Sequence, residues 1–108
     1  MMYIAAWNWF DEFQRSAQDS GDIERQRLPA LAYQAWRYQD ANQFRMASET
    51  FKEGPDLARK LHERCWELFF DYWCAQGMLY HTRQIQEALD ALMRLTVRAH
   101  KPEYALCD

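Results

Sequence analysis

One segment constrains the fold of this 108-residue chain more than any other: residues 65–81, CWELFFDYWCAQGMLYH, carry six aromatic rings and only two carboxylates. Each residue of an α-helix is rotated by about 100° from the one before, so these rings cannot gather on one side. Phe69 and Trp73 share a face, whereas Tyr72 and Leu79 point elsewhere. A helix that is apolar nearly all round must be covered on more than one side. The segment is therefore predicted to be a central helix that contacts both earlier and later helices.

The rest of the composition indicates an all-α protein. Hydrophobic residues make up 49% of the chain, which is enough apolar surface to close the core of a single domain over residues 1–108. Only three glycines and three prolines are present, and β-branched residues do not alternate regularly with polar ones, so strand signals are weak throughout. We expect about five antiparallel helices.

Apolar residues at helical spacing place these helices along the chain. The first is expected over residues 2–18, the second over 22–39, and the last over 85–101. Asp22 can cap the second helix by accepting hydrogen bonds from free backbone N–H groups, and Pro29 inside that helix predicts a bend. The last helix carries one apolar face and one face of mixed charge, which is typical of exposure to solvent.

The end of the third helix has two possible positions. This helix begins near Phe44, and Gly54 followed by Pro55 is the strongest stop signal in the chain. The helical stripe of apolar residues nevertheless continues beyond this point towards residue 80. The boundary with the fourth helix therefore lies either at Gly54 or near His62, with Pro55 only kinking the earlier helix.

Several residues match the signature of tetratricopeptide repeats. Trp73, Gly77 and Tyr80 stand at the spacing of the W-x2-L-G-x2-Y motif, with Gln76 in place of the leucine. The matching positions of the other helices are Ala35, Tyr38, Ala47, Phe51, Ala88 and Leu92. Residues 28–100 thus resemble that family, although the two A-x3-F pairs lie 41 residues apart instead of 34.

The resemblance implies two helical hairpins. Residues 1–21 would form a capping helix and residues 22–108 two helix pairs of the tetratricopeptide type, with a compact helical bundle as the alternative. In such a pair, a small residue on each helix lets the two backbones approach closely. The close contacts expected here are Ala35 with Ala47 and Gly77 with Ala88.

The same resemblance implies a protein-interaction or scaffold module that binds a peptide or a partner helix in a concave groove. The groove-facing residues would be Ala32, Trp36, Gln39, Asp71, Cys74, Met78 and His81. Aromatic and methionine side chains suit a partner surface because they bury a large area and adapt in shape. None of these positions carries lysine or arginine, so a basic clamp for carboxylate-ended peptides is not expected.

Self-association is a further expectation. Repeat arrays usually need three or more units, whereas only two repeat-like helix pairs are recognised in this sequence. Trp7 and Trp9 cannot both lie on the helix face that carries Phe10 and Phe13. We therefore expect at least one of these tryptophans to be exposed and available for a homodimer.

The alternative function is that of a compact bundle that holds a small apolar ligand among its aromatic helices, with Asp71 or His81 as the polar anchor. Such a protein should show a sizeable enclosed cavity lined by residues 66–80. An interaction module should instead show tightly packed rings and an open apolar groove beside Trp36 and Met78.

Charge and motifs argue against several other functions. Thirteen basic and sixteen acidic residues leave a formal net charge of -3 without a basic cluster, so nucleic acid is not an expected partner. Residues 65–80 are too short, and too interrupted by carboxylates, to span a membrane. No phosphate-binding glycine loop or nucleophile elbow is present in the sequence, so neither enzymatic activity nor a cofactor is expected.

The cysteines favour a reducing location. Cys65, Cys74 and Cys107 make an odd count without the spacing of a disulfide framework, which favours the cytoplasm, with Cys65 and Cys74 packing as small apolar side chains. His62 and His81 could join them as metal ligands. However, Cys65 and Cys74 are about half a turn out of phase on one helix, so the four side chains cannot converge on one ion. No metal site is expected.

Overall fold

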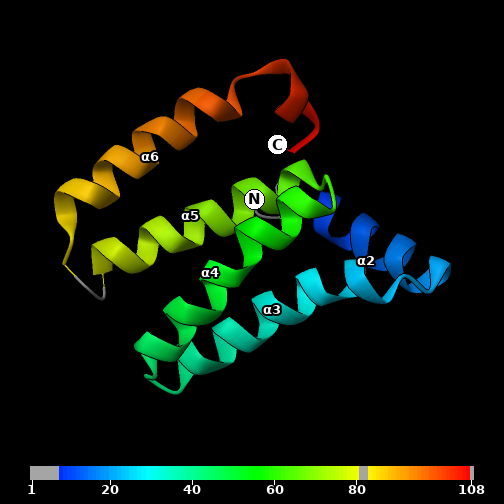
Figure 1. Cartoon of the computed structure of the whole chain (residues 1–108), viewed down its shortest axis with the longest axis horizontal. Coiled ribbons are helices and arrows are strands. Elements are labelled where there is room, and N and C mark those ends of the chain that lie inside the picture. The colour runs from blue at the N-terminus through cyan, green and yellow to red at the C-terminus, as the bar shows by residue number, and fades with distance from the viewer. Residues whose placement is uncertain (1–7, 81–82, 108) are drawn as a thin grey trace.

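The computed structural model describes residues 8–80 and 83–107, and this part of the chain is helical apart from its turns (Figure 1). Its elements are α2 (Asn8–Ser20), α3 (Ile23–Asp40), α4 (Phe44–Lys60), α5 (Arg64–Tyr80), α6 (Ile85–Ala99) and the 3-10 helix η1 (Pro102–Cys107). The predicted all-α fold class is confirmed. The expected start of the first helix, near residue 2, lies outside the described residues.

Consecutive helices run antiparallel, and each packs against the next one along the chain (Figure 1). Four residues with positive φ, between 57° and 68°, mark the turns at intervals of 20 or 21 residues: Gly21, Asn42, His62 and Arg83. This left-handed conformation lets the chain close the last turn of a helix. The N–H of Gln43 donates to the carbonyl of Tyr38 at 2.8 Å, and that of Glu63 to the carbonyl of Ala58 at 2.9 Å. One helix and one such turn are thus a structural unit that recurs along the chain.

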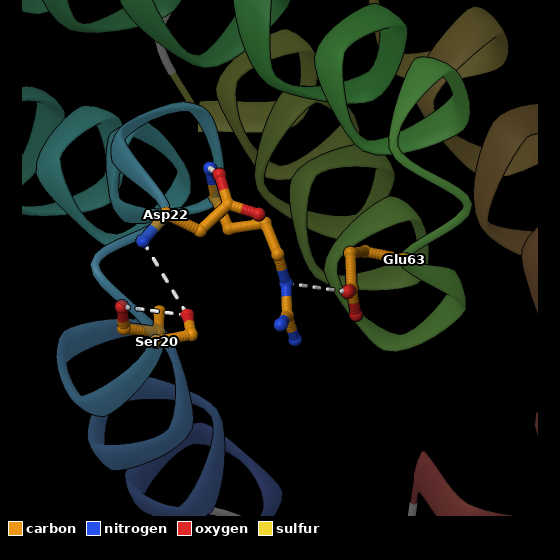
Figure 2. Close-up of polar contacts among 5 residues, drawn as sticks. Ser20, Asp22 and Glu63 are labelled. Carbon is orange, nitrogen blue, oxygen red and sulfur yellow. Dashed lines mark hydrogen bonds and ion pairs between the residues drawn. The ribbon is translucent and has the colours of Figure 1, made fainter.

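A cap and an ion pair fix the start of α3 (Figure 2). The Asp22 Oδ1 atom accepts a hydrogen bond from the backbone N–H of Arg25 at 3.1 Å, which confirms the predicted cap. The Arg25 Nε donates to Glu63 Oε1, also at 3.1 Å, and this contact ties the turn before α3 to the turn before α5. Helix α3 then continues through Pro29 to Asp40.

Helix α4 continues through Gly54 and Pro55 to Lys60, so the boundary with the next helix lies near His62. Both Gly54 and Pro55 are buried. A Cβ atom at residue 54 would lie 2.1 Å from Cγ of Phe70, a distance that real Cβ atoms do not adopt. Because residue 54 has no side chain, the Phe70 ring of α5 can lie directly against the α4 backbone. The helix continues here in spite of the local stop signal.

Helix α5 is central, as predicted. The Trp66 ring, which is fully buried, lies 4.9 Å from that of Phe10 on α2. Further along α5, the Trp73 ring lies 5.9 Å from Trp36 on α3 and stacks at 5.6 Å on Phe51 of α4. Each such ring pair contributes about 0.5–1.5 kcal/mol beyond the burial of its area. The aromatic segment is therefore the packing centre that joins three earlier helices.

A disulfide between Cys65 and Cys107 holds the C-terminal segment against α5. The prediction that Cys65 packs as a reduced apolar side chain is therefore wrong. Tyr104 of η1 is buried, and the guanidinium groups of Arg64 and Arg98 each lie 5.9 Å from its ring centroid. Disulfides are typical of oxidising compartments. The bond removes the cysteine argument for a reducing compartment, and the cytoplasmic location stays an untested prediction.

One of the two expected close contacts is not formed. Ala88 is fully buried. A Cβ atom at Gly77, however, would point to Ser48 Oγ on α4 at 3.9 Å, and no atom of Ala88 lies within 4 Å of that position. The expectation that Gly77 makes room for Ala88 is therefore wrong, and the close glycine crossing lies between α4 and α5 instead. Ala35 and Ala47 are both buried on helices that pack against each other.

Candidate binding cleft

A cleft of about 230 Å³ opens between α5 and α6, beside the C-terminal end of α4. Its lining residues are Arg59 from α4, Asp71, Cys74, Ala75 and Met78 from α5, and Ala91, Arg94, Leu95 and Arg98 from α6. Residues three or four apart lie on one face of a helix, which explains why Asp71, Cys74 and Met78 reach the same cleft. Three of the residues predicted to bind a partner are therefore brought together.

The uncharged part of the cleft is apolar. Met78, Ala91 and Leu95 are half-buried there. Cys74 is a free thiol, and burial raises its pKa to about 11, with the charge of Asp71 adding to the rise. The thiol is therefore protonated at neutral pH, so it supplies apolar surface and not a nucleophile.

Three guanidinium groups border the same cleft. Arg98 forms an ion pair with Asp71, and Nη1 of Arg59 lies 3.7 Å from Oε1 of the buried Glu67. Arg94 is exposed and forms no ion pair with any other described residue. The cleft therefore presents an unbalanced positive charge at Arg94, on a chain whose formal net charge is -3.

The other residues predicted to face a groove do not reach this cleft. Ala32 is fully buried in the core, so it has no surface to offer a partner. The half-buried Trp36 packs its ring at 5.7 Å from that of Phe69. Gln39 lines a separate hollow, and His81 lies outside the described residues. One continuous groove along α3 and α5 is not formed by these positions.

Of the two tryptophans expected to mediate self-association, the structure describes only one. Trp7 lies outside the described residues. Trp9 is half-buried, and its ring packs edge to face at 5.3 Å from Trp66. It also lies 6.1 Å from the ring of Phe69. Trp9 is therefore an edge of the aromatic core.

Sequence reasoning missed the arginines of the cleft. The mixed charges of the last helix predict a solvated face that includes Arg98. In the structure, however, Arg98 turns towards α5. A signal for this contact exists, because Asp71 has no cation three or four residues away on its own helix. Any cationic partner therefore has to come from another element, and the structure supplies Arg98.

A second hollow, of about 180 Å³, lies between α3, α4 and α5. Its lining residues are Gln39, Ala47, Ser48, Phe51, Trp73, Gln76 and Gly77. Sites for small molecules typically measure about 300–1,000 Å³, so this hollow is small for a ligand. The expected anchor Asp71 lines the other cleft instead.

Comparisons with known proteins identify neither a family for the chain nor a function for the cleft. No protein-family model matches it, and no curated protein or solved structure is significantly similar. Within residues 8–80 and 83–107, no group of three His, Cys, Asp or Glu side chains is placed to hold a metal ion. None of the described helices is both long enough and apolar enough to cross a membrane.

Proposed function

We propose that the chain is a protein-interaction module resembling tetratricopeptide repeats, without enzymatic activity, and that the cleft between α5 and α6 binds a peptide or partner helix. The bound segment would carry an acidic side chain next to apolar ones. Its carboxylate would pair with Arg94, and its apolar side chains would contact Met78 and Leu95.

The observation that carries this function is the position of Arg94, an exposed guanidinium beside half-buried apolar side chains. A guanidinium presents planar donors that match the geometry of a carboxylate, and such charge-assisted hydrogen bonds are about twice as strong as neutral ones. The cores of protein interfaces are enriched in Met and Arg. A cleft of about 230 Å³ fits a few side chains of a larger partner.

The arrangement of the helices supports the same role. Each helix packs against its neighbours in the chain, as in stacked helical repeats, which present extended surfaces to partner proteins. The period of two helices, 41 residues from Gly21 to His62, exceeds the 34 of tetratricopeptide repeats. The difference follows from helix length, because α3, α4 and α5 contain 17 or 18 residues each.

Binding of a small apolar ligand among the rings has less support. Trp66 and Phe70 are fully buried by the surrounding helices. The hollow beside Trp73 measures only about 180 Å³. The rings of α5 from Trp66 to Trp73 thus contact neighbouring rings, which supports an interaction module over a ligand cavity.

Selection of peptides from a random library displayed on phage tests the proposal with the intact chain as bait. We expect the enriched peptides to combine Asp or Glu with Leu, Phe or Met, and to bind the chain in a fluorescence titration. Enrichment of basic peptides, or a failure to enrich any peptide, would contradict the proposal.

Three variants locate the binding site of the selected peptides. Arg94→Glu should weaken binding about tenfold or more, because it opposes two like charges in the cleft. Arg15→Glu on α2 makes the same charge change on an exposed arginine of another helix, so its affinity should match that of the wild type. Equal losses in both variants would show that only the net charge of the chain matters. Met78→Ala should also weaken binding, through lost apolar contact.

A further inference from the structure

Helix α6 carries a second apolar strip on the side that faces away from α5. Ile85, Leu89, Met93 and Val97 follow one another at intervals of four residues and are 55%, 45%, 67% and 69% exposed. Within the described chain, α6 packs mainly on α5 and η1, and its outer side lies at the edge of the molecule (Figure 1). Four large apolar side chains in a row are therefore in contact with solvent.

This strip differs from the other exposed apolar side chains of the described residues. The others are spread over three helices: Ile23, Tyr33, Phe44, Met46 and Tyr72. Single exposed apolar residues are normal on a soluble protein, whereas a contiguous apolar patch marks an interaction surface. The strip on α6 has that contiguous form.

The charges beside the strip change sign along α6. Asp90 lies in its N-terminal half, and Arg94 follows towards its C-terminal end. At 100° per residue, both lie on the same flank, next to Val97. This order also suits the dipole of a single helix. Beside an exposed apolar strip, it has a second consequence: a copy of α6 packed antiparallel about a twofold axis would bring opposite charges together, whereas in a parallel twofold pair the two charged flanks would lie on opposite sides of the contact.

We infer that the chain forms a homodimer through this strip, with the two α6 helices antiparallel about a twofold axis. Leu89 then contacts the partner's Met93, and Ile85 contacts the partner's Val97. Asp90 lies beside the partner's Arg94, and symmetry repeats each contact. This surface is separate from the expected tryptophan surface of α2. Because Arg94 borders the cleft as well, an acidic peptide and the second copy compete for its charge.

Sedimentation velocity of the intact chain, over a range of concentrations and without peptide, tests the dimer. We expect a reversible monomer–dimer equilibrium that Leu89→Glu weakens at least about tenfold, because the change places two carboxylates in the apolar contact. The matched control is Ile23→Glu, the same kind of change at an exposed apolar residue of α3, which should leave the equilibrium unchanged. A monomer at every concentration, or equal effects of the two variants, would overturn the inference.

The antiparallel orientation has its own test. A double variant that exchanges the charges, Asp90→Arg with Arg94→Asp, should self-associate as the wild type does. It should not pair with the wild type, because acidic side chains would then face acidic ones and basic side chains basic ones. Native mass spectrometry of the double variant mixed with 15N-labelled wild type measures this directly. Free formation of mixed dimers would overturn the antiparallel arrangement.

Discussion

The ring of Phe70 lies directly against the backbone of Gly54, so that a Cβ atom at residue 54 would be 2.1 to 2.4 Å from three carbons of the ring. The contact brings α4 and α5 together at the centre of the fold, where Phe70 itself is fully buried. It explains why a glycine stands at residue 54 in the middle of α4.

The two glycines inside helices should respond to alanine in opposite ways. Gly54→Ala should lower the free energy of unfolding by about 3 kcal/mol, because the new methyl group collides with Phe70. Gly77→Ala should raise it by about 0.5–1 kcal/mol, because the nearest atom is Ser48 Oγ at 3.9 Å and alanine favours the helix. Urea unfolding followed by circular dichroism measures both.

The clash can be separated from a general loss of helix stability by a double-mutant cycle. Phe70→Leu should be less harmful in the Gly54→Ala background than in the wild type, because the smaller side chain makes room for the methyl group. Additive effects of the two changes would contradict the contact between Gly54 and Phe70.

The left-handed turns predict a second set of stability changes. His62→Gly should raise the free energy of unfolding by about 0.5–1 kcal/mol, because glycine adopts positive φ without the steric cost of a Cβ atom. Asn42→Gly should give a smaller gain, because asparagine tolerates this conformation better than histidine. Gly21→Ala should cost about 1 kcal/mol even though no other atom lies within 4 Å of the new methyl group. Thermal unfolding of the three variants checks the order, and a loss of stability in His62→Gly would contradict it.

The disulfide predicts one free thiol per chain under non-reducing conditions, that of Cys74. Cys107→Ser should lower the free energy of unfolding by about 2–4 kcal/mol, because the bond closes a loop with a sequence separation of 42. In this variant, the rate of hydrogen exchange should increase more in η1 than in α5, since η1 is a short segment at the end of the fold. Thiol titration tests the pairing, urea unfolding tests the loss of stability, and hydrogen exchange tests the effect on η1. Three free thiols in the native chain would contradict the pairing.

Glu63 predicts a dependence of stability on pH. Burial raises its pKa above the ordinary value of 4.5, and the nearby Arg25 offsets part of that rise. The folded chain thus holds this proton more tightly than the unfolded chain, so the stabilising contribution is complete below pH 4.5 and falls as pH rises through the folded pKa. The free energy of unfolding of Glu63→Gln minus that of the wild type should therefore be larger at pH 7 than at pH 4, as measured by urea unfolding.

Arg25 supplies the control for that titration. Arg25→Gln removes the cation that lowers the pKa of Glu63, so stability should fall more steeply with rising pH than in the wild type. A difference between wild type and Glu63→Gln that does not change with pH would contradict the assignment to Glu63.

The features that depend on local sequence are the ones that the sequence predicts well. The helical period of apolar residues and the cap at Asp22 act over a few residues, and both are confirmed in the structure. The central place of α5 also follows from its own composition, because a helix with rings on several sides needs several neighbours.

The features that depend on tertiary contacts could not be predicted in this way. The stop signal of Gly54 and Pro55 does not end α4, and Gly54 instead packs against Phe70, a residue of another helix. The pairing of Cys65 with Cys107 joins distant segments, and spacing alone does not reveal it. The arginines of the cleft could not be predicted for the same reason, because Arg98 of α6 pairs with Asp71 of another helix, α5.

Amide chemical shifts of the 15N-labelled chain, recorded during titration with a selected acidic peptide, test the central proposal most directly. The cleft between α5 and α6 predicts that the largest shift changes occur at Cys74, Met78 and Arg94 and saturate together. Changes confined to the hollow beside Gln39 and Gly77, or spread evenly over the chain, would contradict it.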